Sequence, residues 1–489
     1  MTNAKIRVES IYDLALAKLL QDKLEKVVLV SPTKDQQEFL SIEDTNQPHD
    51  IHIGDLEYRN GIQIKGVSAT VDKIEKLFRE SLPDSIIFKH PIQQDAVYNA
   101  TVIKYLYRKR MAILDLDGNQ QAIMFNVETN VGNKHTVQVK ELTTEKDKLP
   151  ICSDVITLSG DYVILEVDAD FVRVSRKIKA DDRTKLHDFG KKVVPDGFGV
   201  IIRTSANSVK LDEVENEINK LVEMWEGIEA SIGHDDDSTE LFGGQKVSEI
   251  ILGNASKVFL DKLRSEVADT IKNYHYFKAY SMATGLTIDF AQQFIEKVGK
   301  EELGLSLENM ILSRDYPIGN HVKVQFNYLN GTTDESIIGN ISKTGDIIVT
   351  KRVLSRSHQH STPDLILEEG DLMEVHFSYG SWTIHYKFFS SLSGELIGEK
   401  VKIITPLDFI YRGRIRGFDM GMTLQKLSDG TVTSDVDNSV SDMVKRGMIS
   451  KSLDAKLGEV SRVAMEMLKA GNDSIVIRLD QWNPMKNVF

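Results

Sequence analysis

The pair Arg203 and Thr204 directly follows the apolar run 199–202, which we expect to be a short buried strand. A guanidinium group can give two parallel hydrogen bonds to a phosphate, and a neighbouring hydroxyl can give a third. At the end of a strand, both side chains would be held at the edge of a sheet. The pair is therefore a candidate phosphate-binding site.

Positive charge is concentrated shortly before this pair. Residues 173–192 contain eight Lys or Arg and three Asp, whereas the whole chain of 489 residues has a formal net charge of −13. Segregated positive charge on an acidic protein favours a polyanionic partner, although an ordinary solvated helix surface is the alternative. We predict that Arg173, Arg176, Lys177 and Arg183 contact phosphates.

Aromatic and basic residues also alternate near position 105. Tyr105 and Tyr107 lie beside Arg108 and other basic residues, at the end of one of several short predicted strands in residues 96–155. Such strands are typical of a small oligonucleotide-binding barrel, which holds single strands by stacking and charge. The alternative is that the tyrosines only pack the barrel. On the first interpretation, Tyr105, Tyr107 and Arg108 bind RNA.

Other polar clusters have simpler interpretations. The triplet 235–237 is three adjacent Asp residues in a Gly- and Ser-flanked stretch, which we interpret as a solvated linker because adjacent carboxylates do not converge on one ion. The histidines His358, His360, His376 and His385 are expected to be structural or exposed, since no carboxylate spacing beside them suggests a metal site.

Composition limits the class of protein. The chain is 41% hydrophobic and 27% charged, as is usual for globular proteins, and contains no apolar run of the ~18–20 residues that a membrane span needs. The first residues lack the form of a signal peptide, and the single cysteine, Cys152, excludes an intrachain disulfide. We therefore expect a cytoplasmic protein without a membrane partner.

Periodicity and turn signals divide the chain into four parts. Residues 1–95 read as a small α/β domain with a hairpin at Asn60-Gly61, and residues 96–155 read as the barrel. Residues 156–315 form an α/β region in which Trp225 belongs to the buried face of a helix, and residues 316–489 form a β-rich domain that ends in helices.

The segments ITLSGDYVIL, VSRKIKADDRT and PDGFGVIIRTSA, with the helix ending in MWEGI, resemble the ribonuclease E/G family in order and spacing. That resemblance implies that Arg203 and Thr204 belong to a pocket that senses the 5′-monophosphate of RNA. Gly160 and Val163 or Ile164 would line the pocket. The preceding barrel would correspond to an S1 domain.

The whole chain resembles an archaeal family of AU-rich-RNA-binding proteins that are probable ribonucleases. The C-terminal segments WTIHYKFF, GELIGEKVKIITPLDF, RIRGFDM and KRGMISKSL carry this likeness. It implies an α+β multidomain protein with a small N-terminal α/β unit, an S1/OB-like barrel, a ribonuclease E/G-like α/β region and a C-terminal β-barrel-like domain with closing helices. It also implies endonucleolytic maturation or degradation of precursor ribosomal RNA at AU-rich single-stranded or loop regions.

Two departures from these families leave alternatives open. The two aspartates that hold magnesium in ribonuclease E have no counterpart that we can identify, so a non-catalytic RNA chaperone or assembly factor is a second hypothesis. Relatives of the C-terminal domain are metal-dependent nucleotide phosphatases, and here only Asp419 remains of their carboxylate motif, with Asp429, Asp435 and Asp437 downstream. Asp419 is thus the candidate ligand for Mg²⁺.

Overall fold

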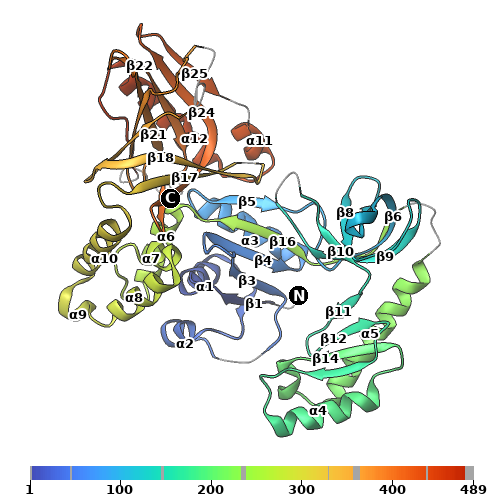
Figure 1. Cartoon of the computed structure of the whole chain (residues 1–489). Helices are drawn as coiled ribbons and strands as arrows, with labels where there is room; N and C mark the ends of the chain where they lie inside the picture. Colours follow the sequence, from blue (N-terminus) through green and yellow to red (C-terminus); the bar gives the residue numbers. More distant parts are fainter. Residues whose placement is uncertain are drawn as a thin grey trace.

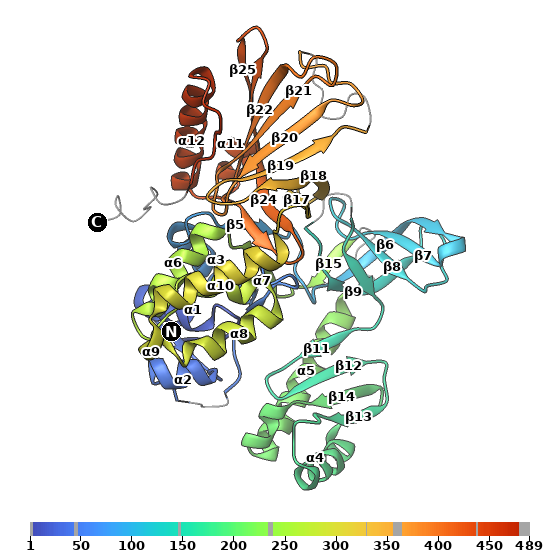
Figure 2. The ribbon, with the colours of Figure 1, turned by 60° about the vertical axis from the view of Figure 1, so that its left-hand side comes forward.

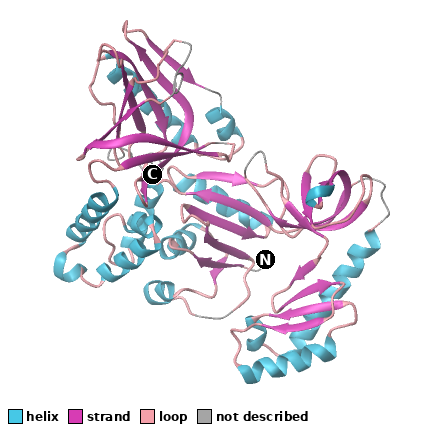
Figure 3. Ribbon diagram, viewed as in Figure 1, coloured by secondary structure: helices cyan, strands magenta, loops and turns pink. Residues whose placement is uncertain are grey.

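The structure is a computed structural model that describes residues 3–43, 47–144, 148–232, 238–328, 330–355, 364–436 and 439–478. It is an α+β multidomain protein, as predicted (Figure 1). Figure 3 shows helices gathered in the lower half of the molecule and a largely β-stranded domain above them. The acidic triplet 235–237, His358, His360 and Asp437 lie outside the described residues.

The N-terminal unit is a six-stranded sheet with the order β2-β1-β3-β4-β16-β5, in which β1 is parallel to both of its neighbours and the other pairs are antiparallel. Helices on its faces bury leucine, isoleucine and valine side chains against it. The elements are β1 (Ala4–Glu9), α1 (Asp13–Lys23), β2 (Val27–Leu29), α2 (Lys34–Leu40), β3 (Ile51–Asp55), β4 (Gly61–Gly66), α3 (Ser68–Ser81), β5 (Ile86–Lys89) and β16 (Lys246–Ile251).

The hairpin predicted at Asn60-Gly61 is present as β3 and β4. The connection between the strands, however, is not the tight two-residue turn that Asn-Gly favours. Residues 56–60 form the connection, and the positive φ, 54°, is at Arg59. Gly61 is needed for a different reason, because a Cβ there would lie 2.1 Å from the carbonyl oxygen of Ile250 in β16. The glycine therefore permits the close approach of a strand that comes from much later in the chain.

The second unit is a closed β-barrel, because β6 pairs with β9 as well as with β7. Alternate residues of its strands are buried, which fills the interior with small and medium apolar side chains. Its elements are β6 (Val97–Leu106), η1 (Tyr107–Lys109), β7 (Met111–Asp115), β8 (Gln121–Phe125), β9 (Lys134–Glu141) and β10 (Ile151–Ser153), with β15 (Thr239–Phe242) added at the edge of β6.

The third unit is a four-stranded sheet with the order β11-β12-β14-β13, packed against two helices. Trp225 is 7% exposed in this core, so its prediction as a core residue is confirmed. The elements are β11 (Thr157–Ser159), β12 (Val163–Val167), β13 (Phe171–Val174), α4 (Ala180–Val193), β14 (Phe198–Ile202), η2 (Thr204–Ser208) and α5 (Leu211–Ser231).

A helical segment then packs beside the N-terminal unit. It consists of α6 (Asn254–Ser265), α7 (Tyr274–Tyr280), α8 (Met282–Gln292), α9 (Ile295–Val298) and α10 (Lys300–Asp315). The first turn of α6 is held by Asp84, whose carboxylate accepts hydrogen bonds from the backbone N–H groups of Ala255 and Ser256 at 2.9 and 2.8 Å. A carboxylate at a helix N-terminus satisfies donors that the helix itself leaves free.

The C-terminal domain is a nine-stranded sheet that closes on itself through β17 and β24, with α11 and α12 packed on β22 and β24. Phe88 of β5 packs against Phe418 of β24, which joins this domain to the N-terminal unit. The elements are β17 (His321–Asn327), β18 (Thr333–Lys343), β19 (Ile348–Val353), β20 (Leu372–Phe377), β21 (Thr383–Phe389), β22 (Leu396–Ile404), β23 (Asp408–Ile410), β24 (Arg414–Leu427), β25 (Val432–Val436), α11 (Ser439–Lys445) and α12 (Lys451–Lys469).

The chain crosses between these units more often than the sequence suggests. After α5, β15 returns to the barrel and β16 enters the N-terminal sheet between β4 and β5. Both segments lie within the single region predicted for residues 156–315. Local sequence patterns could not separate them, because such patterns contain no information about pairing partners far away in the chain. Within the described residues, no helix is long and apolar enough to cross a membrane.

Candidate functional site

Strand pairing in the sheet of the third unit brings the predicted phosphate-binding residues to one edge. Figure 1 shows this sheet below the barrel. β13 runs parallel to β14 with Val174 opposite Ile202, so Ser175 and Arg203 follow the two strands at the same edge. β12 runs antiparallel to β14, so the loop before it, which contains Gly160, lies at that edge as well. We call the side chains and loop at this edge the sheet-edge site.

Direct contacts connect the residues of the sheet-edge site. Arg203 donates from Nη1 to the carbonyl oxygen of Gly160 at 2.7 Å. The hydroxyl groups of Thr204 and Ser175 lie 2.9 Å apart and share a hydrogen bond. Gly160, Arg203 and Thr204 are thus brought together, and Ser175 completes the cluster.

A partly buried contact between backbone N–H groups and a carboxylate at this edge was not predicted from the sequence. The backbone N–H groups of Asp161, Tyr162 and Val163 donate to the carboxylate of Glu217 in α5, at 2.7, 2.6 and 2.9 Å. A Cβ on Gly160 would lie 2.5 Å from the carboxyl carbon of Glu217, so a side chain there would displace this carboxylate. Successive N–H groups that converge on one anion form a nest, and here an internal carboxylate occupies it.

The predicted basic residues are only partly brought together. Arg176 and Lys177 are exposed and follow β13 directly, next to the sheet-edge site. Arg183 lies in the first turns of α4 and is half-buried. Arg173 is exposed within β13 and its guanidinium stacks on the Phe171 ring, 4.2 Å from the centroid. The four cations form a surface around the edge and do not converge on one point.

The predicted barrel residues lie on a separate lobe, which Figure 2 shows beside the β11–β14 sheet. Tyr107 is 72% exposed, and its ring contacts that of Tyr105 edge to face at a centroid distance of 4.6 Å. The hydroxyl of Tyr105 donates to the carbonyl of Val127 at 2.8 Å, which fixes this ring as a support. Arg108 is exposed beside them in η1.

Phe125 extends this aromatic surface and was not singled out in the sequence. It is 46% exposed at the end of β8, opposite Met111, and Met111 in turn lies opposite Leu106, the residue before Tyr107. The alternation of β8 alone indicates that Phe125 points away from the barrel interior, but only the register shows that it reaches the end of the barrel that carries Tyr107.

The electrostatic surroundings of the sheet-edge site include the N-terminal unit. Burial, followed by the charges of His52, Arg7 and Arg203, lowers the pKa of His49 to about 4. Arg203 is therefore close enough to disfavour a proton on His49. Burial and then the charges of Glu213, Asp161 and Glu217 raise the pKa of Tyr162, so one side of the site is acidic.

Asp419 does not fit the predicted magnesium site. Its carboxylate pairs with Lys402 and accepts a hydrogen bond from the N–H of Gly421 at 3.0 Å. Asp429 is engaged with Thr431 in a turn, and Asp435 is exposed on β25. Among the described residues, no three His, Cys, Asp or Glu side chains gather as they would around an ion.

The strand histidines are buried and engaged within the protein, as the sequence indicated. His376 contacts Glu374 at 2.7 Å and the Ser474 hydroxyl at 2.9 Å. His385 contacts Glu399 at 2.9 Å and accepts from the N–H of Ile475 at 3.2 Å. Both rings therefore hold the chain segment that follows α12 against β20 and β21.

Comparison with solved structures gives partial likenesses, of which two follow. A phosphatase, SC4828, with the non-hydrolyzable nucleotide GPCP is 10% identical, with a TM-score of 0.26 over 33% of this chain and 86% of that chain. The complex of FomD with CDP is 9% identical, with a TM-score of 0.25 over 36% of this chain and 93% of that chain.

Comparison at the level of sequence covers far more of the chain. Residues 157–302 match the model of the Ribonuclease E/G family, a range that includes the whole sheet-edge site. The Probable ribonuclease FAU-1 of Pyrococcus horikoshii is 26% identical over 92% of this chain and 95% of its own length. Those of Thermococcus gammatolerans and Halobacterium salinarum are 25% and 23% identical over 92% of this chain and 96% and 97% of their own lengths. The chain is similar to these probable ribonucleases over most of its length, and its central region matches the Ribonuclease E/G family model.

Proposed function

We propose that this protein is an RNA-binding endoribonuclease that acts on precursor ribosomal RNA at AU-rich single-stranded or loop regions, in the cytoplasm. The observation that carries the proposal is the convergence of Arg203, Thr204 and Gly160 at one sheet edge, inside the range that matches the Ribonuclease E/G family. The exposed Arg176 and Lys177 beside that edge add positive charge where an RNA backbone would pass.

The chemistry of the sheet-edge site suits a phosphate. A guanidinium has five N–H donors, and the contact with Gly160 uses Nη1, so Arg203 retains donors for a phosphate while its position is fixed by the loop. The Thr204 hydroxyl, oriented by Ser175, adds a donor beside it. A terminal 5′-monophosphate carries more negative charge than an internal phosphate, so this arrangement favours RNA ends that bear one.

The barrel supplies a second contact with RNA in this proposal. The exposed ring of Tyr107, supported by Tyr105, offers a face on which a base can stack, and Arg108 lies within reach of the adjoining backbone. Any unpaired base can stack on an aromatic ring, whereas the bases of duplex RNA are already paired and stacked within the helix. The two surfaces together select single-stranded segments.

Binding of matched RNAs tests the phosphate-binding role. The affinities of AU-rich RNAs with a 5′-monophosphate or a 5′-hydroxyl would be measured by fluorescence anisotropy for the wild type and for Arg203→Ala. We expect Arg203→Ala to weaken binding, and more for the monophosphate end, by about tenfold. Arg462→Ala, which removes an exposed arginine of α12, is the control. Equal affinities of the wild type and Arg203→Ala would remove the sheet-edge site from the proposal.

The alternative is an RNA chaperone or assembly factor that uses the same surfaces and does not cleave. It predicts tight, salt-sensitive binding of the same RNAs with no cuts, either with Mg²⁺ or with EDTA. The nucleotide phosphatase alternative depends on Asp419, and the pairing of that carboxylate with Lys402 counts against it. Phosphate release from nucleoside diphosphates that disappears in Asp419→Ala would support it nevertheless.

A further inference from the structure

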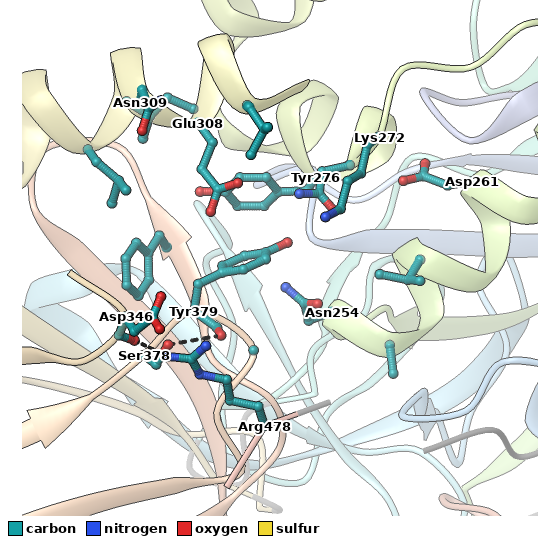
Figure 4. A pocket seen from close by; sticks show the side chains of 18 of the residues that line it. Asn254, Asp261, Lys272, Tyr276, Glu308, Asn309, Asp346, Ser378, Tyr379 and Arg478 are labelled. Carbon is teal, nitrogen blue, oxygen red and sulfur yellow. Dashed lines mark hydrogen bonds between the residues drawn. The ribbon is translucent and has the colours of Figure 1, made fainter. Parts of the chain in front are cut away.

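A large cavity lies between the helical segment and the C-terminal domain, away from the sheet-edge site. Its volume is about 940 Å³, which is in the range of sites that bind small molecules. Figure 4 shows side chains of α6, α7 and α10 on one side and of the C-terminal domain, including Tyr379, on the other. None of the residues predicted from the sequence lines it.

Two aromatic rings form part of the cavity wall. The rings of Tyr276 and Tyr379 have centroids 4.6 Å apart, and Phe409 packs behind Tyr379 at 5.8 Å. Tyr276 is 5% exposed, so its ring is fixed by the core of the helical segment. Fixed aromatic rings of this kind present an apolar surface against which a planar ligand can pack.

Polar groups at the cavity are held in place by buried partners. Asn254 is 1% exposed and donates to Asp408 at 3.3 Å, and its side chain also hydrogen-bonds Tyr379. Asp261 lines the cavity and accepts from the N–H of His275 at 2.9 Å, with the His275 ring nitrogen 2.7 Å from the same oxygen. The amide and the carboxylate are thus oriented before any ligand arrives.

Further carboxylate groups face the Tyr379 hydroxyl. Its pKa is raised well above the usual value by burial, then by the charge of Asp408, and further by Asp261 and Glu308. Glu308 comes from α10 and projects into the cavity in Figure 4. Carboxylates in this position accept hydrogen bonds from amino and imino groups, as a base edge provides.

Positive charge also lies at the rim of the cavity. Lys272 and Lys262 are exposed lysines at its rim, and Arg478 is fixed there by donation to the backbone carbonyl of Asp346. Lys272 is held close to α10, because a Cβ on Gly304 would lie 3.1 Å from the Cβ of Lys272. The cavity therefore combines cations with carboxylates, which suits a ligand that carries both negative charge and hydrogen-bond donors.

We propose that this cavity binds one nucleotide, with its base against Tyr276 and Tyr379 and its phosphate at Lys272. A nucleotide combines a planar base that carries N–H donors with an anionic phosphate, which matches the rings, the carboxylates and the lysines together. Neither inorganic phosphate nor a metal ion alone would use all three. The proposal does not rest on the function proposed above, because the cavity shares no residue with the sheet-edge site.

Titration calorimetry with the full chain tests this site. The wild type, and a chain carrying Arg203→Ala so that only the cavity can respond, would be titrated with AMP, GMP, CMP, UMP and inorganic phosphate. We expect at least one nucleoside monophosphate to bind the Arg203→Ala chain more tightly than inorganic phosphate does, and the wild type to show this binding in addition to any binding at the sheet-edge site. Lys272→Ala should weaken that binding by about tenfold, and Glu308→Gln should change the preference among bases. Lys297→Ala, an exposed lysine of α9 outside the cavity, is the control.

Two results would overturn the proposal: equal binding of inorganic phosphate and every nucleotide, or equal affinities for Lys272→Ala and Lys297→Ala. Thermal melting of each variant separates loss of binding from loss of fold. Competition then identifies the source of the nucleotide. If the monophosphate displaces labelled RNA from the Arg203→Ala chain but not from one that also carries Lys272→Ala, the cavity holds a nucleotide of RNA. If it displaces no RNA from the Arg203→Ala chain, the cavity holds a free nucleotide.

Discussion

At the scale of single residues, Glu217 controls the geometry of the sheet-edge site. Its carboxylate receives the N–H groups of Asp161, Tyr162 and Val163, and this positions the carbonyl of Gly160 that Arg203 contacts. Hydrogen bonds to a charged acceptor are stronger than neutral ones, and donors left without an acceptor in a partly buried loop are costly. Arg203 thus depends on a residue that touches it only through the loop.

We therefore expect Glu217→Ala to loosen this loop without unfolding the rest of the chain. Each lost hydrogen bond to the carboxylate is worth about 1.5–3 kcal/mol, so amide exchange in residues 161–163 should accelerate by at least about tenfold. Hydrogen exchange with mass spectrometry measures this. Glu223→Ala, an exposed residue of the same helix, should leave the loop unchanged. Unaltered exchange in Glu217→Ala would contradict this role.

His49 gives the same site a dependence on pH. Its folded pKa of about 4 lies below the usual 6.5, so between these values the unfolded chain binds a proton that the folded chain does not. Stability from this residue is therefore complete above pH 6.5 and is lost as the pH falls towards 4. Melting temperatures of the wild type and His49→Gln should diverge least near pH 7 and most at acid pH, where only the wild type carries the cost of excluding a proton from a buried ring. A His49 ring that titrates near 6.5 by NMR would disprove the assignment.

At the scale of elements, the pairing of short strands determines which residues lie close together. The apolar run of β14 and the periodicity of α5 were predictable, as was the position of Arg203 and Thr204 at a strand end. The nest around Glu217 was not, because it joins α5 to a loop that is distant in sequence. The insertion of β16 between β4 and β5 was likewise hidden, since strand pairing depends on partners and not on local pattern.

The barrel allows a prediction at this scale, because η1 presents Tyr107 at the end of β6. Tyr107→Ala should weaken binding of single-stranded RNA by about 1–3 kcal/mol, the usual contribution of one stacked base, and leave duplex RNA unaffected. Anisotropy titrations with both RNAs measure the difference. Tyr58→Ala, with a tyrosine 73% exposed in the N-terminal unit against 72% for Tyr107, is a matched control. If the two variants bound RNA alike, the barrel surface would have no special role.

At the scale of the whole molecule, one buried ionic network joins the units. Lys257 of α6 pairs with Asp408 of the C-terminal domain, and the side chains are only 2% and 8% exposed. Asn254 donates to the same carboxylate. Burial lowers the pKa of Arg416, and the negative charge of Asp408 partly offsets this effect. Such a network fixes the helical segment against the C-terminal domain, and its member Asn254 lines the cavity between them.

Asp408→Asn should therefore destabilise the contact between these parts strongly. It leaves the Lys257 ammonium buried without a counter-charge, which costs about 3–5 kcal/mol. The midpoint of urea unfolding should fall, whereas Asp170→Asn, an exposed carboxylate in the third unit, should leave it unchanged. An unchanged midpoint in Asp408→Asn would show that Lys257 is not confined to the interior.

The most direct test of the account is cleavage of a 5′-labelled, AU-rich precursor ribosomal RNA by the wild type and Arg203→Ala, each with Mg²⁺ or with EDTA. We expect discrete cuts by the wild type that require the metal, and slower or absent cuts by Arg203→Ala prepared in the same way. The variant also controls for a contaminating nuclease, which would act equally in both preparations. Tight, salt-sensitive binding of the RNA by the wild type with no cuts under either condition would contradict the nuclease function and leave an RNA-binding factor.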